Sequence, residues 1–337
     1  MEMPYNDIIR KFIDMYAGRL RNQVSFMLSA CNFYMPIFEE ALDAYGLPLE
    51  LRYLPIIESA LNPSAVSRAG ASGLWQFMIG TGKIYGLESN SLVDERRDPI
   101  KATWAAARYL KEMYDIYGDW NLVIAAYNCG PGTINKAIRR ANGETDYWKI
   151  YNYLPKETRG YVPAFIAANY VMTYYCDHNI CPMETNIPAS TDTVQVNKNL
   201  HFEQIADLCN VPLDQIKSLN PQYKKQMIPG DSKPYTLRLP IDAISTFIDK
   251  QDTIYAHRAD ELFRNRKTVA VKEITPSTRK TTTAVAGKGK LTYYTIKSGD
   301  TLSTIAGKYG VTIKDIQRWN GMSNTKIAAG KRLKIYK

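Results

Sequence analysis

Over residues 1–186, apolar positions recur at helical spacing, and short breaks made of Pro and Gly separate one such stretch from the next. Strict apolar–polar alternation, the pattern of a half-buried strand, is scarce there. The clearest boundary is Asp98-Pro99, since Asp caps free amide groups at a helix start and Pro fits the first helical position. That helix should end at Gly118. We expect further helices from about 119 to between 128 and 130 and from 161 to about 175, and hence a mainly α-helical domain.

The second half of the chain contains an internal repeat. The segment QIADLCNVPLDQIKSLN (204–220) matches TIAGKYGVTIKDIQRWN (304–320) without a gap, at an offset of 100 residues. Each copy predicts the order strand, helix, helix, strand, which is a small α+β (βααβ) unit. A Thr- and Lys-rich stretch with few apolar residues separates the copies and is typical of a flexible linker. We therefore expect four parts: 1–186, 187–250 (the first copy), 251–291 (the linker) and 292–337 (the second copy).

The composition is that of a folded protein with a basic tail. A chain of 337 residues with 45% apolar residues can bury two or three cores, which excludes wholesale disorder. The net charge of +10 is concentrated in residues 266–290 and 293–337, which carry +6 and +7. Such a tail can bind nucleic acid, anionic lipid or an acidic polymer. No zinc spacing or base-stacking motif accompanies it, so we expect a solvated linker and no nucleic-acid partner.

Neither a metal nor a cofactor is expected from the sequence. The five cysteines lack the paired spacing of a zinc site. Cys176 and Cys181 are close enough to form a small disulfide loop if the protein is exported.

The strongest candidate for chemistry is Glu58, which lies inside the apolar run 54–61. Apolar neighbours remove water from a carboxylate, disfavour its charged form and raise its pKa. A raised pKa is what a general acid needs near neutral pH. Taken alone the pattern is weak, because a Glu near a helix end is more often a cap or one partner of an ion pair.

Three further motifs surround this glutamate with small and neutral polar residues. They are GLWQFM (73–78), which follows Ser67, then AAYNCGPG (125–132) and ETRGYV (157–162). Small residues let the backbone approach a ligand closely. Gln, Asn, Ser and Tyr supply the neutral donors and acceptors that sugar hydroxyl and acetamido groups require.

Together these motifs resemble the lytic transglycosylases that carry a lysozyme-like catalytic domain. The resemblance implies cleavage of peptidoglycan between N-acetylmuramic acid (MurNAc) and N-acetylglucosamine (GlcNAc), with Glu58 as the catalytic acid and base. It places substrate contacts on Ser67, Gln76, Met78, Tyr127, Asn128 and Tyr161. Met78 could instead belong to the core, and Trp75 could be either a sugar platform or a core residue.

The second copy resembles the LysM module, through GDTL (299–302) and the helix pattern that follows it. The resemblance implies a βααβ fold that binds GlcNAc-containing glycans such as peptidoglycan. Its ligand loops correspond to Gly299–Leu302 and to about 319–327. The implied glycan-binding residues are Gly299, Asp300, Thr301, Leu302 and Asn320. The first copy has Asn199-Leu200 in place of Gly299-Asp300, so it either binds glycan or serves as a spacer on the catalytic domain.

The signature contains one carboxylate, whereas ordinary glycosidases use two. The acids that follow in sequence lie in a polar stretch, where we expect them to cap or to pair: Glu88, Asp94, Glu95 and Asp98. The resemblance therefore implies substrate assistance, with closure of a 1,6-anhydro ring on MurNAc and no water consumed. A hydrolytic muramidase of the goose-lysozyme type and a non-catalytic wall-binding protein remain alternatives, and a distant segment could still supply a second carboxylate.

This function requires export to the periplasm or cell envelope. The start, MEMPYNDIIRKF, has no apolar core of an export signal, and the sequence contains no apolar run long enough to span a membrane. We expect a chain whose export signal is missing here, with possible attachment to the outer membrane through a lipoprotein N-terminus that is also missing.

Overall fold

The computed structural model describes residues 1–263 and 291–336, apart from positions 186, 189, 298, 299, 321, 323–326 and 329. The chain divides into two compact units, Met1–Thr275 and Pro276–Lys337. Positions 264–290 of the proposed linker lie outside the described residues. Gly299, a predicted glycan contact, also lies outside them.

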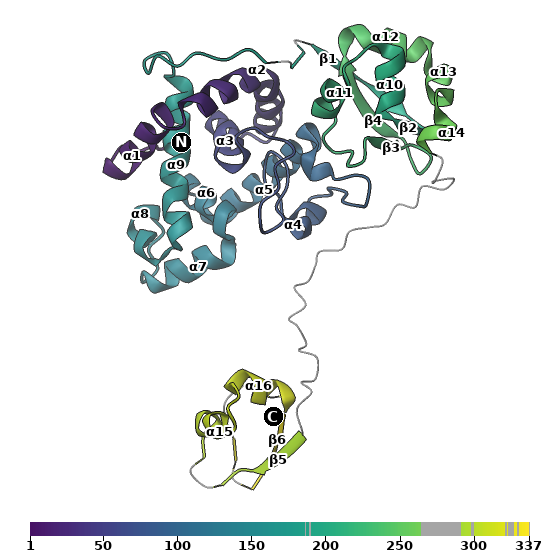
Figure 1. Ribbon diagram of the computed structural model, residues 1–337. Coiled ribbons are helices and arrows are strands. Elements are labelled where there is room, and N and C mark those ends of the chain that lie inside the picture. The colour runs from purple at the N-terminus through teal and green to yellow at the C-terminus, as the bar shows by residue number, and fades with distance from the viewer. Residues whose placement is uncertain are drawn as a thin grey trace. The chain divides into compact units, whose positions relative to one another are not determined.

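The first unit begins with a helical domain (Figure 1), and its buried apolar side chains form one core. Short 3-10 turns connect several of its helices. The helix α6 has five consecutive buried residues, Leu122–Ala126, and contacts both α5 and α9. The helices are α1 (Asp7–Ala17), α2 (Arg21–Ala44), α3 (Leu54–Ser59), α4 (Ile79–Ile84), α5 (Pro99–Tyr117), α6 (Trp120–Cys129), α7 (Pro131–Arg140), α8 (Tyr147–Ile150) and α9 (Lys156–Thr173).

Capping residues set the helix boundaries that the sequence predicts best. The Asp98 carboxylate accepts hydrogen bonds from the amides of Ile100 and Lys101, both at 3.0 Å, and α5 ends at Gly118 with φ +62°. Both ends agree with the prediction. The helix expected from 161 begins five residues earlier, at Lys156, because its first turn is polar and lies outside the apolar pattern.

The first copy completes this unit with its own core (Figure 1). It has the predicted strand–helix–helix–strand order, with a second, shorter strand added on each side of the helices. The strand β1 (Thr191–Val196) pairs antiparallel with β4 (Tyr235–Pro240), and β2 (Asn199–His201) pairs with β3 (Met227–Pro229). The helices between them are α10 (Phe202–Cys209) and α11 (Leu213–Leu219).

The expected linker start at 251 is too early. After α12 (Ile241–Asp249) the chain forms α13 (Gln251–Ala256) and α14 (Ala259–Leu262). Ile254 of α13 is fully buried in the core of the first copy. These helices are too short for an apolar period to show in the sequence.

The second copy has the same order, with β5 (Leu291–Thr295) antiparallel to β6 (Arg332–Tyr336) and the helices α15 (Leu302–Tyr309) and α16 (Ile313–Trp319) between them. One asparagine has the same role in both copies. The Asn220 amide donates to the Arg238 carbonyl at 2.7 Å and accepts from the Arg238 amide at 2.8 Å. Asn320 makes the matching pair with Lys334 at 2.9 and 2.7 Å. The asparagine thus ties the second helix of each copy to its last strand.

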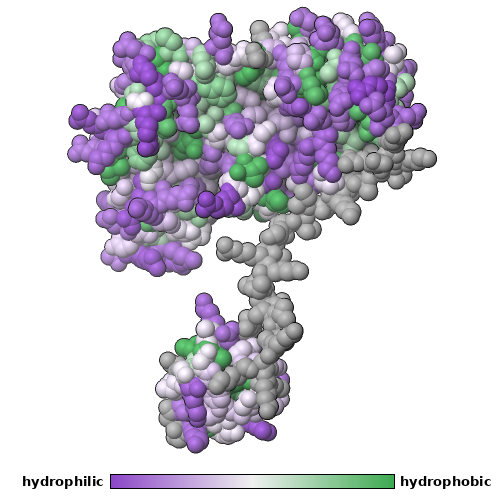
Figure 2. Space-filling model, in the orientation of Figure 1, coloured by the Kyte–Doolittle hydropathy of each residue, from purple (hydrophilic) through white to green (hydrophobic). Residues whose placement is uncertain are grey.

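The surface is what we expect when most apolar side chains are buried in these cores. On the face shown in Figure 2, hydrophilic residues predominate and apolar residues are scattered among them. None of the helices in the described ranges combines the length and the apolar character needed to cross a lipid bilayer.

Candidate active site

Glu58 lies in the last turn of α3, a helix of six residues. The helix stops there because Ala60 and Leu61 both adopt left-handed backbone angles, with φ of +51° and +58°. The half-buried Glu58 side chain lines a cavity of about 440 Å³. The other walls come from α1, from α2 and from a loop that we call the active-site loop, residues 65–78.

The pKa of Glu58 is raised from its ordinary value of 4.5 to about 7. Burial among apolar residues is the largest cause, because it disfavours the charged form. The Tyr161 hydroxyl, which reaches over from α9, donates a hydrogen bond to Glu58 Oε1 and opposes this rise, whereas the negative charge of Glu157 adds to it. Glu58 is therefore poised to give up a proton near neutral pH and to take one back.

The active-site loop presents two of the predicted contacts to the cavity, Ser67 and Gln76. The Ser67 hydroxyl oxygen accepts from the Ala71 amide at 3.0 Å, so its hydrogen can be donated to a ligand. Gln76 has a left-handed φ of +49°, and its side-chain amide donates to the Gly73 carbonyl at 2.8 Å. These bonds fold the loop back on itself and fix both side chains at the cavity wall.

Tyr127 and Asn128 come from the end of α6. The Tyr127 hydroxyl donates to the Trp75 carbonyl at 2.7 Å, and burial together with the charge of Glu58 raises the pKa of Tyr127 well above its usual range. Tyr127 is thus a neutral group close to the acid. The Asn128 side-chain oxygen accepts from the Thr158 hydroxyl at 2.9 Å, which connects α6 to α9.

The structure decides whether two residues that the sequence leaves open belong to the core. Trp75 is fully buried and its indole donates to the Thr103 hydroxyl at 2.9 Å, so it belongs to the core and is not a sugar platform. Met78 is 45% exposed, which excludes a core role, but it does not line the cavity of Glu58. Its contact with substrate stays a prediction.

Sequence reasoning missed the opposite wall of the cavity, which consists of Tyr16, Leu20, Gln23 and Met27. These residues lie on or next to the first two helices, and no local motif marks them. The expectation for the nearby acids is confirmed. Asp98 caps α5, while Asp94, Glu95 and Glu88 pair with Arg96, Lys101 and Lys233.

In the second copy, most of the predicted glycan contacts also support the fold. Asp300 accepts from the Tyr294 hydroxyl and the Lys297 amide, both at 2.8 Å, and Thr301 caps α15. Leu302 is buried in the core, and the Asn320 amide is engaged by backbone. Among the described residues of this predicted set, Asn320 alone lines a cavity of about 410 Å³, whose other lining residues are Ile296, Met322, Ile327, Ala328, Lys331, Arg332 and Leu333.

A mainly helical domain with a protonatable glutamate at the end of a short helix, facing a polar loop, defines a lysozyme-like glycan-cleaving site. Three family models match the sequence. The Transglycosylase SLT domain matches residues 35–150, the Lytic transglycosylase MltD, LysM-like domain matches 190–256, and the LysM domain matches 294–335.

Membrane-bound lytic murein transglycosylase D of Escherichia coli strain K12 is 32% identical over 341 residues, covering 99% of this chain and 70% of that protein. The soluble lytic murein transglycosylase of the same strain is 33% identical over 124 residues, or 35% of this chain and 19% of that protein. The crystal structure of the 70 kDa soluble lytic transglycosylase of Escherichia coli matches 42% of this chain and 24% of its own, with 29% identity and a TM-score of 0.37.

The chain therefore belongs to the lytic murein transglycosylases, with a lysozyme-like SLT domain followed by LysM-type modules. This confirms the predicted family, fold class and enzyme class.

Proposed function

We propose that Glu58 cleaves the MurNAc–GlcNAc bond of peptidoglycan first as an acid and then as a base, leaving a 1,6-anhydro-MurNAc end. The observation that carries this assignment is the Glu58 carboxyl, hydrogen-bonded by Tyr161 in a cavity, with a pKa raised to about 7. A carboxyl with this pKa is present in both protonation states near neutral pH, as the two steps require.

In the first step protonated Glu58 donates its proton to the glycosidic oxygen, and the bond from that oxygen to the MurNAc anomeric carbon breaks. The acetamido oxygen of the same sugar forms a bond to the anomeric carbon. In the second step ionised Glu58 removes the proton from the C6 hydroxyl. The C6 oxygen then attacks the anomeric carbon and displaces the acetamido oxygen, so no water is consumed and Glu58 regains its proton.

The remaining predicted contacts orient the acetamido group and the sugar ring. Ser67 and Gln76 line the wall formed by the active-site loop, and Tyr127 is a neutral neighbour of Glu58. Asn128 lies next to Tyr127 at the end of α6, and its free amide hydrogens are donors for a sugar carbonyl. These fixed neutral groups hold the acetamido oxygen in line for attack on the anomeric carbon without competing with Glu58 for its proton. Met78 contributes from the exposed end of the same loop.

One observation favours a second candidate, a hydrolytic muramidase. Glu157 is a second carboxylate whose charge acts on Glu58, and hydrolytic glycosidases use such a pair. Its side chain is exposed on the first turn of α9 and does not line the cavity, so we prefer the single-acid mechanism. The two mechanisms differ in product mass, because an anhydro end is lighter by one water than a reducing end.

The second copy supplies binding to the wall. The enzyme then works in the periplasm, where its substrate lies, and we include attachment to the outer membrane through a lipoprotein anchor in the proposal. The name of the relative that covers 99% of this chain, a membrane-bound enzyme, supports this location. Cell fractionation and palmitate labelling of the protein expressed from its own gene test it, since an unlabelled protein in the soluble periplasmic fraction would exclude the anchor.

Digestion of purified sacculi tests the catalytic proposal. The unmodified chain should release anhydromuropeptides, and Glu58→Gln should release none while it still sediments with sacculi. Glu157→Gln is the matched control, and it should keep the anhydro product. Full activity of Glu58→Gln, or reducing-end products that disappear in Glu157→Gln, would contradict the mechanism.

A further inference from the structure

The first copy is joined to the catalytic domain by backbone hydrogen bonds. We call residues 88–97 of the catalytic domain the bridging loop. The Asp94 amide donates to the Gln222 carbonyl at 2.9 Å, and the Lys224 amide donates to the Leu92 carbonyl at 2.8 Å. Between these bonds Val93 and Tyr223 form an antiparallel bridge, and both are buried. The bridging loop thus adds a short strand-like contact to the first copy.

The residues of the first copy that make this contact correspond to a region that forms a cavity in the second copy. At the repeat offset of 100, Gln222 and Met227 correspond to Met322 and Ile327, which line the cavity of about 410 Å³. In the first copy Gln222 is 6% and Met227 2% exposed. The region that is open in the second copy is therefore occupied in the first by the copy's own side chains and by the bridging loop.

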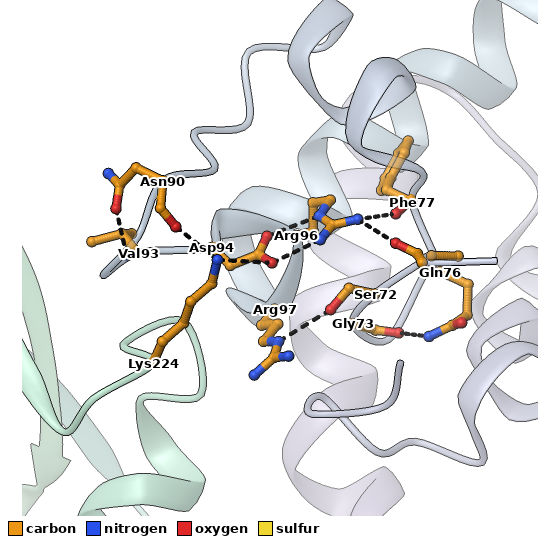
Figure 3. Close-up of polar contacts among 12 residues, drawn as sticks. Ser72, Gly73, Gln76, Phe77, Asn90, Val93, Asp94, Arg96, Arg97 and Lys224 are labelled. Atoms are coloured by element: carbon orange, nitrogen blue, oxygen red, sulfur yellow. Dashed lines mark hydrogen bonds and ion pairs between the residues drawn. The ribbon is translucent and has the colours of Figure 1, made fainter. Parts of the chain in front are cut away.

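A buried chain of charges continues from this contact toward the active site (Figure 3). The Lys224 ammonium donates to the Asn90 carbonyl at 2.7 Å and lies 3.7 Å from the Asp94 carboxylate. Asp94 receives two hydrogen bonds from the Arg96 guanidinium, at 2.9 and 2.8 Å. The Asp94 and Arg96 side chains are only 2% and 6% exposed, so this pair is shielded from solvent screening.

The Arg96 nitrogen that does not bond to Asp94 holds the active-site loop. This nitrogen, Nη1, donates to the Phe77 carbonyl at 2.9 Å (Figure 3). It also donates to the Gly70 carbonyl at 2.8 Å, so it holds both ends of the turn that carries Gln76. The backbones touch as well, since a Cβ on Gly73 would lie 1.7 Å from the Arg96 carbonyl oxygen. The position of Gln76 in the cavity therefore depends on where Arg96 is held.

We propose that the first copy is a positioning module for catalysis, in which Lys224 acts through Asp94 and Arg96 to hold the active-site loop against Glu58, and that the face corresponding to the second copy's cavity serves this docking instead of glycan binding. Lys224 is a positioning residue, because it touches neither Glu58 nor the cavity. The inference rests on the proposed role of the active-site loop in binding the sugar.

Steady-state kinetics on soluble, uncrosslinked glycan strands test the proposal in the full chain. Lys224→Met should lower kcat about tenfold and leave KM within about twofold, because a slightly misplaced loop weakens transition-state contacts more than ground-state binding. Lys224→Arg should restore kcat, since it returns a cation and its donors. Lys225→Met is the matched control, because this adjacent lysine is exposed, and it should behave as the unmodified chain.

A second variant keeps the test independent of folding. Asp94→Asn preserves shape and removes the buried negative charge, and it should show the same fall in kcat at temperatures where thermal unfolding shows the protein to be fully folded. Equal kcat in Lys224→Met and Lys225→Met would overturn the proposal, and so would a loss that merely follows the unfolded fraction. Failure of Glu58 as the acid is recognised separately, because Glu58→Gln would then stay active with Lys224 intact.

Discussion

Tyr161 donates a hydrogen bond to Glu58 from 103 positions further along the chain. This bond favours the ionised carboxylate and lowers the pKa of Glu58, against the larger effect of burial. Tyr161→Phe should therefore raise the pKa of Glu58 and move the basic limb of the pH–rate profile to higher pH. The rate at the optimum should fall about tenfold, because the ionised Glu58 carboxylate of the second step loses the hydrogen bond that stabilises its negative charge.

The measurement is muropeptide release from sacculi between pH 5 and 9. Tyr174→Phe, a half-exposed tyrosine at the end of α9, is the control and should leave the profile unchanged. A basic limb that stays in place in Tyr161→Phe would show that this hydroxyl does not set the protonation of Glu58.

The raised pKa of Glu58 also predicts a pH-dependent cost to stability. For an acid whose pKa is higher in the folded state, folding is penalised once pH rises above the unfolded value, here from 4.5 toward 7. The full penalty, on the order of 3 kcal/mol, applies above the folded value. Glu58→Gln removes it, so this variant should match the unmodified chain near pH 4 and exceed its stability by up to about 3 kcal/mol at pH 8.

Urea unfolding of the two proteins at several pH values measures this difference. Every other titrating group is common to both proteins, so their contributions cancel. A stability difference that does not change between pH 4 and pH 8 would contradict the raised pKa.

The buried Arg96 guanidinium should be among the most costly single side chains to remove. Arg96→Met leaves the Asp94 carboxylate buried without its bidentate partner, and removes the donor from two loop carbonyls. We expect a loss of about 3–5 kcal/mol in the free energy of unfolding. Arg108→Met is the control, since its ion pair with Glu112 is exposed and should contribute less than about 1 kcal/mol. If chemical denaturation gave comparable losses in the free energy of unfolding for the two variants, the buried contacts of Arg96 would not stabilise the fold as predicted.

Substituting either of two glycines of the active-site loop distinguishes the effect of backbone strain from that of a steric clash. Gly70 and Gly73 have nearly equal φ values, +89° and +87°. A Cβ on Gly70 would meet nothing within 4 Å, whereas one on Gly73 would overlap the Arg96 carbonyl. Gly70→Ala should cost about 1–2 kcal/mol through strain alone. Gly73→Ala should cost more and abolish activity, and equal thermal stability and activity of the two variants would disprove the close approach.

The sequence predicts what adjacent residues determine. The ends of α5 follow from Asp98 and Gly118, because capping and left-handed turns are local properties. The repeat predicts the βααβ order, and the motif around Glu58 predicts the acid. The helices α13 and α14 escape prediction because each is one or two turns long.

The rest of the site depends on packing between distant segments. Gln23 and Met27 of α2 line the cavity together with Glu58 of α3, although they precede it by 35 and 31 positions and neither lies in a recognisable motif. Trp75 is adjacent to Gln76 in the sequence yet points into the core, since its indole finds the Thr103 hydroxyl of α5. The residue type at one position does not predict whether its side chain points into the core or into the cavity. Here the left-handed turn at Gln76 decides it.

The asparagine that ties helix to strand in each copy has a consequence for protein engineering. Because Asn220 and Asn320 bind main-chain atoms of Arg238 and Lys334, this part of the fold's frame does not depend on which side chains the last strand carries. The loop sequence of one copy can therefore be exchanged for that of the other without removing this tie. A chimera with the 321–327 sequence at 221–227 would keep the scaffold of the first copy and release its face from the bridging loop. The first copy would then become a second glycan-binding module.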